Sequence, residues 1–119
     1  MSTRGQQERI ELLQGTLDLL ILRTLQLGPV HGHAIAKTIE LRTDDVLQVE
    51  QGSLYPALHR LIKRRWISFN EGVSENNRRA RFYRLTAAGR KQLQAETHDW
   101  EQTAAIIARF FTAKAEDLK

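Results

Sequence analysis

The 119-residue chain contains no cysteine and only two prolines. The lack of cysteine excludes disulfides, thiolate zinc sites and cysteine nucleophiles. Little proline, together with 41% hydrophobic and 27% charged residues, predicts a folded chain rather than a disordered one. This length is sufficient for one compact domain with a single hydrophobic core.

Long hydrophobic runs are also missing. The most apolar stretch, residues 17–22, is too short to span a bilayer and is interrupted by Asp18. Residues 2–9 are polar, which is not the pattern of a secretory signal. We therefore expect a soluble, cytoplasmic protein whose polar residues 1–11 are frayed.

Enzyme motifs are absent as well. The chain has no G-x-S-x-G, no H-E-x-x-H and no phosphate-cradling glycine loop. His31 and His33 are two residues apart and do not share a helix face, so they do not predict a metal site. We expect a protein that is not an enzyme and that needs no cofactor or metal.

The positive charge is concentrated in one segment. The formal net charge is +4, but residues 51–84 alone carry eight basic and two acidic residues, which leaves the rest of the chain at −2. The eight basic residues are Arg60, Lys63, Arg64, Arg65, Arg78, Arg79, Arg81 and Arg84. A local basic surface is what a polyanion such as DNA requires.

Apolar residues at helical spacing predict three helices in the first half of the chain. The first has Thr16 as its N-cap and is stopped by Gly28-Pro29. The second covers residues 32–42. The third starts near Ser53, which can cap it, because Pro56 is tolerated only within a first turn.

The third helix is expected to be apolar on one face and basic on the other. Its apolar face carries Leu54, Leu58, Leu61 and Ile62. Its opposite face carries Pro56, His59, Arg60 and Lys63, with Tyr55 and Arg64 at the edges. Such a helix can pack on a core while it presents cations to a partner.

Two strands and a long helix complete the expected order. Residues 66–70 and 80–85 are rich in aromatic and β-branched residues, and a turn-forming linker joins them into a hairpin with a basic tip. Thr86 then caps a helix over residues 86–115. Helix, helix, helix, hairpin, helix is the order of a winged helix-turn-helix, so we predict a mostly α, α+β fold.

Four segments of the chain resemble the PadR family of bacterial regulators over residues 12–115. They are Gly15-Thr16-Leu17, Gly28-Pro29-Val30-His31-Gly32, Gly52-Ser53-Leu54-Tyr55-Pro56-Ala57-Leu58 and Tyr83-Arg84-Leu85-Thr86-Ala87-Ala88-Gly89. The sequence departs at His33, where many members carry a tyrosine. The resemblance implies a homodimeric repressor of the small subclass, with a winged-helix domain over 12–86 and a dimerisation helix over 87–115.

We therefore predict sequence-specific binding to double-stranded DNA at a palindromic promoter site. The predicted DNA-binding residues are Ser53, Tyr55, Pro56, His59, Arg60, Lys63, Arg64, Arg78, Arg79 and Arg81. Tyr55 can pack its ring on the core while its hydroxyl reaches a phosphate. The alternative is a winged-helix protein-interaction module that does not bind DNA, which would need no cationic wing.

The last helix carries an apolar stripe with a 3.5-residue period, which is typical of a packed helix seam. The predicted dimer-interface residues are Leu93, Thr97, Trp100, Ala104, Ile107, Phe110 and Phe111, and Ile106 widens the stripe. Leu12, Leu13 and Leu17 of the first helix are expected to supply further apolar surface to this interface. Trp100 is either plain dimer packing or a platform for a small aromatic effector.

Overall fold

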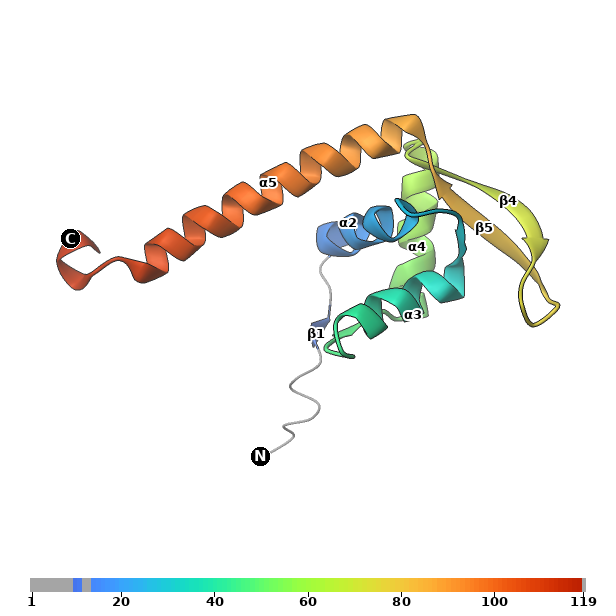
Figure 1. The fold of residues 1–119 in the computed structure, drawn as a ribbon, viewed down its shortest axis with the longest axis horizontal. Helices are drawn as coiled ribbons and strands as arrows, with labels where there is room; N and C mark the ends of the chain where they lie inside the picture. The colour runs from blue at the N-terminus through green and yellow to red at the C-terminus, as the bar shows by residue number, and fades with distance from the viewer. Residues whose placement is uncertain (1–9, 12–13, 119) are drawn as a thin grey trace, which may run out of the picture.

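The computed structural model describes residues 10–11 and 14–118. Its helices are α2 (Gln14–Leu25), α3 (Gly32–Arg42), α4 (Gln51–Lys63), α5 (Ala87–Thr112) and the 3₁₀ helix η1 (Ala115–Leu118). Its strands are β1 (Ile10–Glu11), β2 (Val30–His31), β3 (Leu47–Gln48), β4 (Ile67–Val73) and β5 (Arg79–Leu85). The α+β fold with a long C-terminal helix confirms the predicted fold class (Figure 1).

The helices α2, α3 and α4 pack into a head, and the hairpin β4–β5 projects from it as a wing (Figure 1). The helix α5 starts at the base of the wing, packs against α2 and then runs beyond the head. A helix of 26 residues is about 39 Å long at 1.5 Å per residue. Much of α5 therefore extends past the other described elements (Figure 1).

A single core holds the head together. Each helix contributes one apolar face, and the wing and the start of α5 close the core at one end. The buried side chains of the helices are Leu17, Ile21, Leu22, Leu25, Ile35, Ile39, Leu54, Ala57, Leu58 and Leu61, and those of the wing and α5 include Ile67, Tyr83, Leu85 and Leu93. Burying an apolar side chain of this size contributes about 1.5–3 kcal/mol, so these contacts fix the helices.

The two strands of the wing belong to a three-stranded antiparallel sheet in the order β2-β5-β4. The short strand β2 joins the turn between α2 and α3 to the hairpin through the pairs Val30↔Tyr83 and His31↔Phe82. His31 also caps α3, because its Nδ1 accepts a hydrogen bond from the backbone N–H of Ala34 at 3.3 Å. Its ring packs edge-on against Phe82 with the ring centroids 5.7 Å apart. One residue thus links the helical head to the wing.

Several predicted boundaries were wrong. The helix α2 begins at Gln14, so Thr16 lies within it, and Ile10–Glu11, expected to be frayed, pair with β3. The hairpin is longer than predicted because β4 continues to Val73 and β5 begins at Arg79. The prediction that residues 1–9 are frayed lies outside the described residues. The boundaries of α3 and the Thr86 cap of α5 were predicted correctly.

Candidate nucleic-acid interface

The start of α4 is the exposed, polar part of the predicted recognition helix. The helix begins at Gln51, two residues earlier than expected, with Glu50 as its N-cap residue and Ser53 in its first turn. Pro56 is therefore the sixth helical residue, not a first-turn residue as predicted. Pro56 has no N–H to offer the preceding turn, and it is tolerated here because that turn is exposed to water. Ser53, Tyr55 and Pro56 lie exposed in the first half of the helix, and His59 is exposed just beyond it.

Tyr55 packs against the start of α3 and is 45% exposed. A Cβ atom on Gly32 would lie only 3.0 Å from the Tyr55 hydroxyl oxygen and 3.2 Å from Cε1. The glycine at the start of α3 therefore leaves the space that the tyrosine ring occupies. Tyr55 is not among the side chains that pack on the core, so the predicted packing of its ring there is not confirmed. Contact between its hydroxyl and a phosphate stays a prediction.

A shallow groove between α3 and α4 adds two cationic or polar positions that sequence reasoning missed. His33 and Lys37 of α3 line this groove of about 250 Å³ together with Gln51 and Tyr55 of α4. Both missed side chains are exposed. Their spacing of four residues on the polar face of α3 was the signal that could have identified them. The exposed surface beside the start of α4 thus belongs to both helices of the helix-turn-helix.

Arg60 does not belong to the exposed basic face, contrary to prediction. Its Nη2 donates a hydrogen bond to Oδ1 of Asp18 on α2 at 2.9 Å. The guanidinium is turned toward the interior of the head, and its Nε is buried without a partner among the described residues. Arg60 is thus partly withdrawn from the exposed face of α4, and its contact with DNA stays a prediction.

Lys63 and Arg64 lie at the other end of α4 from Ser53. Ten residues of helix separate Ser53 from Lys63, which is about 15 Å along the axis. Arg64 stacks over the ring of Trp66 with its guanidinium carbon 5.1 Å from the ring centroid. These two predicted cations are exposed, but the structure groups them with the base of the wing rather than with Tyr55.

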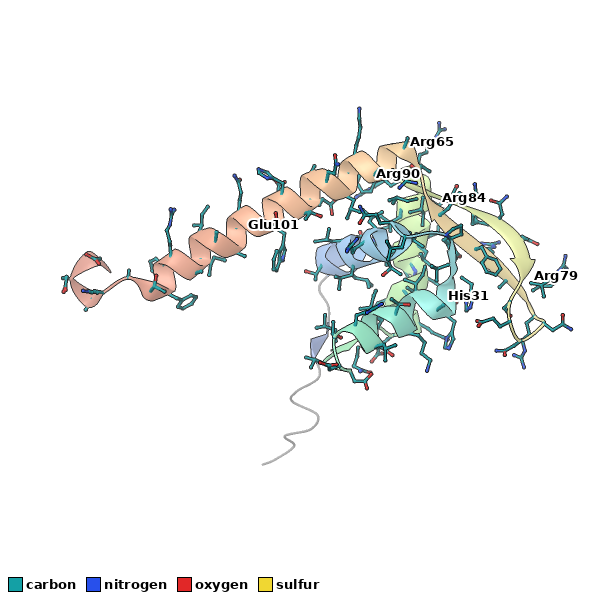
Figure 2. The ribbon with its side chains drawn as sticks, in the orientation of Figure 1. His31, Arg65, Arg79, Arg84, Arg90 and Glu101 are labelled. Carbon is teal, nitrogen blue, oxygen red and sulfur yellow. The ribbon has the colours of Figure 1, made fainter. Side chains whose placement is uncertain are left out.

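The wing carries the remaining predicted cations. Arg78 lies in the turn that joins the strands, next to Arg79 at the start of β5, and both are exposed. Figure 2 shows Arg79 near the tip of the wing. The turn is closed by a hydrogen bond from the Ser74 N–H to the Arg78 carbonyl at 2.8 Å. Arg81 lies over the ring of Phe69 at 4.4 Å and is also exposed. The hairpin thus holds three arginines away from the core.

The second half of α5 presents an apolar stripe that no other described residue covers. Its large exposed side chains are Trp100, Ile106, Ile107, Phe110 and Phe111. Thr97 is exposed and Ala104 is half-buried on the same helix. Trp100 is 58% exposed and Phe111 is 81% exposed, which is unusual for aromatic residues of this size. An uncovered stripe of this kind marks an interaction surface.

Two residues predicted for the dimer interface are buried within their own chain. Leu93 is 3% exposed and belongs to the core of the head, so the uncovered stripe begins after it. Leu17 of α2 is likewise buried in that core, and it leaves no apolar surface for a partner. Leu12 and Leu13, expected to supply more of the interface, lie outside the described residues.

Residues 21–95 match the model of the transcriptional regulator PadR-like family. This chain belongs to the PadR-like family. The match covers the helices α3 and α4, the wing and the start of α5. Members of this family are transcriptional regulators, not enzymes.

Solved structures of regulators agree with this assignment. A transcriptional regulator from Clostridium thermocellum is 33% identical, with a TM-score of 0.74 over 82% of this chain and 94% of the other. A PadR family transcription regulator from Clostridium difficile is 25% identical, with a TM-score of 0.71 over 80% of this chain and 97% of the other. An uncharacterised protein from Lysinibacillus sphaericus is 28% identical over 86% of this chain and 94% of its own length.

The PadR-like chain shows two further features that bear on its partners. Among residues 10–11 and 14–118, each helix is either too short or too polar to cross a membrane. Within the same residues, no three acidic or histidine side chains are grouped so that they could hold a metal ion. The features that stand out are therefore the polar start of α4, the cationic wing and the apolar stripe of α5.

Proposed function

We propose that this PadR-like regulator is a homodimeric repressor that binds a palindromic promoter site through its winged helix. The observation that carries the proposal is the pairing of an exposed, polar first half of α4 with an exposed wing that carries Arg78, Arg79 and Arg81. A helix of this kind fits the major groove, and a cationic hairpin beside it reaches the adjacent backbone or minor groove. A dimer held on a promoter represses by occupying the DNA that the polymerase needs. The site of action is then the bacterial cytoplasm.

The apolar stripe of α5 supports the dimer. Its 3.5-residue spacing suits the stripe of a second α5, and a two-fold pair buries both stripes at once. A two-fold dimer places its two α4 helices on successive major grooves, about 34 Å apart. The matching DNA site is then a palindrome, and each head binds one half-site.

A protein-interaction module that does not bind DNA is the alternative from another class. Such a module requires an exposed surface for its partner, which the stripe of α5 supplies, but it has no use for a cationic wing. The wing places three arginines on a hairpin tip and its flanks, where no described carboxylate forms an ion pair with them. Like charges held together on a surface favour a polyanionic partner. We therefore assign the wing to DNA.

Removing the wing cations should weaken DNA binding without affecting the fold. Arg78→Ala with Arg79→Ala deletes two exposed side chains, so the free energy of unfolding should change by less than about 0.5 kcal/mol. Affinity for DNA of any sequence should fall, because a protein with fewer phosphate contacts releases fewer counterions from the DNA when it binds. The slope of log affinity against log salt should decrease by about 2 per protomer. Fluorescence anisotropy of labelled duplexes at several salt concentrations measures both quantities.

Arg90→Ala with Lys91→Ala is the matched control, because it removes the same charge from α5. Both residues are exposed and lie on α5 rather than on the wing, as Figure 2 shows for Arg90. This variant should bind nearly as the wild type does. Equal affinity and equal salt slope for the wing variant and the wild type would show that the wing points away from the duplex. Affinity that does not change with salt in the wild type itself would refute the proposed function.

Trp100 supports a second role as a platform for a planar aromatic effector. If two Trp100 rings face each other across the dimer axis, a flat apolar molecule can insert between them. Titration with a planar aromatic such as acridine should then quench tryptophan emission in a saturable way. Trp100→Ala should abolish that quenching and leave only Trp66, which is half-buried in the head. Equal quenching in both proteins would assign the signal to Trp66 and dismiss the site.

A further inference from the structure

Asp18 of α2 and Arg60 of α4 form the only ion pair among residues 10–11 and 14–118. The atoms Oδ1 and Nη2 are 2.9 Å apart, and the two side chains are only 10% and 29% exposed. Asp18 is also the only charged residue in the described part of the chain that counts as buried. The pair joins two helices through residues that are 42 positions apart in sequence.

A partly buried pair of this kind is a poor source of stability. The free-energy cost of removing a carboxylate and a guanidinium from water offsets much of the attraction between them. Apolar side chains of similar volume often stabilise a fold equally well. The Arg60 Nε adds to the cost because it is buried with no partner among the described residues. The pair therefore requires an explanation other than the net free energy of folding.

The pair fixes the orientation of α4 relative to α2, which apolar packing alone fixes less strictly. The apolar faces of α2 and α4 can repack with small rotations, and cores of this kind lose a unique arrangement before they lose stability. A hydrogen bond between charged groups depends on distance and angle, so it selects one rotation of α4 about its axis. That rotation decides where Ser53 and Tyr55, on the exposed half of the same helix, are aimed.

We propose that Asp18 and Arg60 are positioning residues for sequence recognition, which rests on the proposed function of DNA binding. Arg60 acts through the orientation of α4 and does not contact the DNA. The helix α2 that carries Asp18 also packs against α5, which holds the proposed dimer stripe. The pair is thus a polar link between α4, which reads the bases in the proposed complex, and α2, which packs against the helix that holds the dimer stripe.

The test replaces the pair by apolar side chains of similar shape, Asp18→Leu with Arg60→Met. Three quantities are compared with the wild type: the urea midpoint of unfolding without DNA, the affinity for a duplex that the wild type enriches from a random-sequence pool, and the affinity for poly(dI-dC). The salt slope is measured on poly(dI-dC). Should this variant not fold, Asp18→Asn alone, which keeps the shape and one acceptor, is compared by its affinities for the two DNAs and by the salt slope. Its unfolding midpoint is not a criterion, because leaving Arg60 without its carboxylate lowers stability by itself.

We expect the unfolding midpoint, the affinity for poly(dI-dC) and its salt slope to remain close to wild type. Affinity for the enriched duplex should fall about tenfold or more, which is the loss that one mismatched base pair in a binding site typically causes. Unchanged affinity for the enriched duplex would reduce the pair to a structural contact and overturn the inference. A salt slope that decreases by about 1 would make Arg60 a phosphate contact and overturn it equally. A wild type that enriches no duplex would overturn the proposed function as well.

Discussion

Replacing Ile107 and Phe111 by glutamate should convert the protein to a monomer that no longer binds its DNA site with specific affinity. Both side chains lie on the uncovered stripe of α5, where they are 49% and 81% exposed in the single chain. In a two-fold seam each glutamate would be buried without a partner, and an unpaired buried charge costs several times what the lost apolar contact contributed. The heads should be unaffected because neither residue belongs to their core.

The loss of DNA affinity follows from the loss of the second head. Two linked heads bind a palindrome with an affinity that exceeds a single head by about 10²–10⁴-fold. Analytical ultracentrifugation should show a monomer, and anisotropy with an enriched duplex should show this loss. Affinity per head for poly(dI-dC) should remain, which separates a broken seam from an unfolded head.

His98→Glu with Ala105→Glu is the matched control for this variant. It adds the same two negative charges to α5, on the face that lies opposite Ile107 by helical geometry. Both positions are exposed. The control should remain a dimer and bind as the wild type does. A dimer that survives the substitutions at Ile107 and Phe111 would show that α5 is not the interface.

The sequence predicted the elements well because their signals are local. The apolar periodicity of residues 32–42 and the Thr86 cap depend only on neighbouring residues, and both were confirmed. The start of α4 was predicted two residues late because Pro56 was treated as a first-turn marker. Proline can occupy the second turn where the preceding turn faces water, and exposure of that kind depends on the tertiary structure.

The candidate site was predicted less completely because its geometry depends on long-range contacts. Arg60 has the helical position of a surface cation, and only the approach of Asp18 from α2 turns it inward. Leu93 has the period of the seam, and only the packing of α5 on the head buries it. A leucine that packs within its own chain and one that packs against a partner chain have the same helical spacing. A periodic pattern therefore cannot distinguish the two kinds of contact.

The junction between the wing and α5 shows how tightly the head controls the direction of that helix. The Thr86 N–H donates to the Trp66 carbonyl at 3.0 Å, and the Thr86 hydroxyl accepts from the Gly89 N–H at the same distance. The first turn of α5 is thereby placed directly against the backbone at the start of the wing. The direction of α5, and with it the spacing of two heads in a dimer, is set at this contact.

Gly89→Ala should therefore be strongly destabilising, although alanine is the better helix former. A Cβ atom on Gly89 would lie 2.0 Å from the carbonyl oxygen of Trp66 and 2.9 Å from Cδ1 of Leu85. Backbone cannot move aside as a flexible side chain can, so either the Thr86 hydrogen bonds break or α5 tilts away. We expect a loss of about 3 kcal/mol from overpacking, which exceeds the gain of about 1 kcal/mol from helix propensity. Thermal unfolding followed by circular dichroism should show a midpoint lower by about 10 °C.

Gly52→Ala supplies the control of opposite sign. Gly52 is also helical, in the first turn of α4, but a Cβ atom there would meet nothing within 4 Å. Its replacement should leave the midpoint unchanged or raise it by a few degrees, because only the helix propensity changes. In the Gly89→Ala variant, α5 could instead relieve the clash by tilting, which would reduce the loss of stability. The tilt would misalign the stripe of α5, and the variant would then sediment as a weaker dimer. A Gly89→Ala protein with both the midpoint and the dimer of the wild type would show that α5 does not leave the head along the backbone of Trp66.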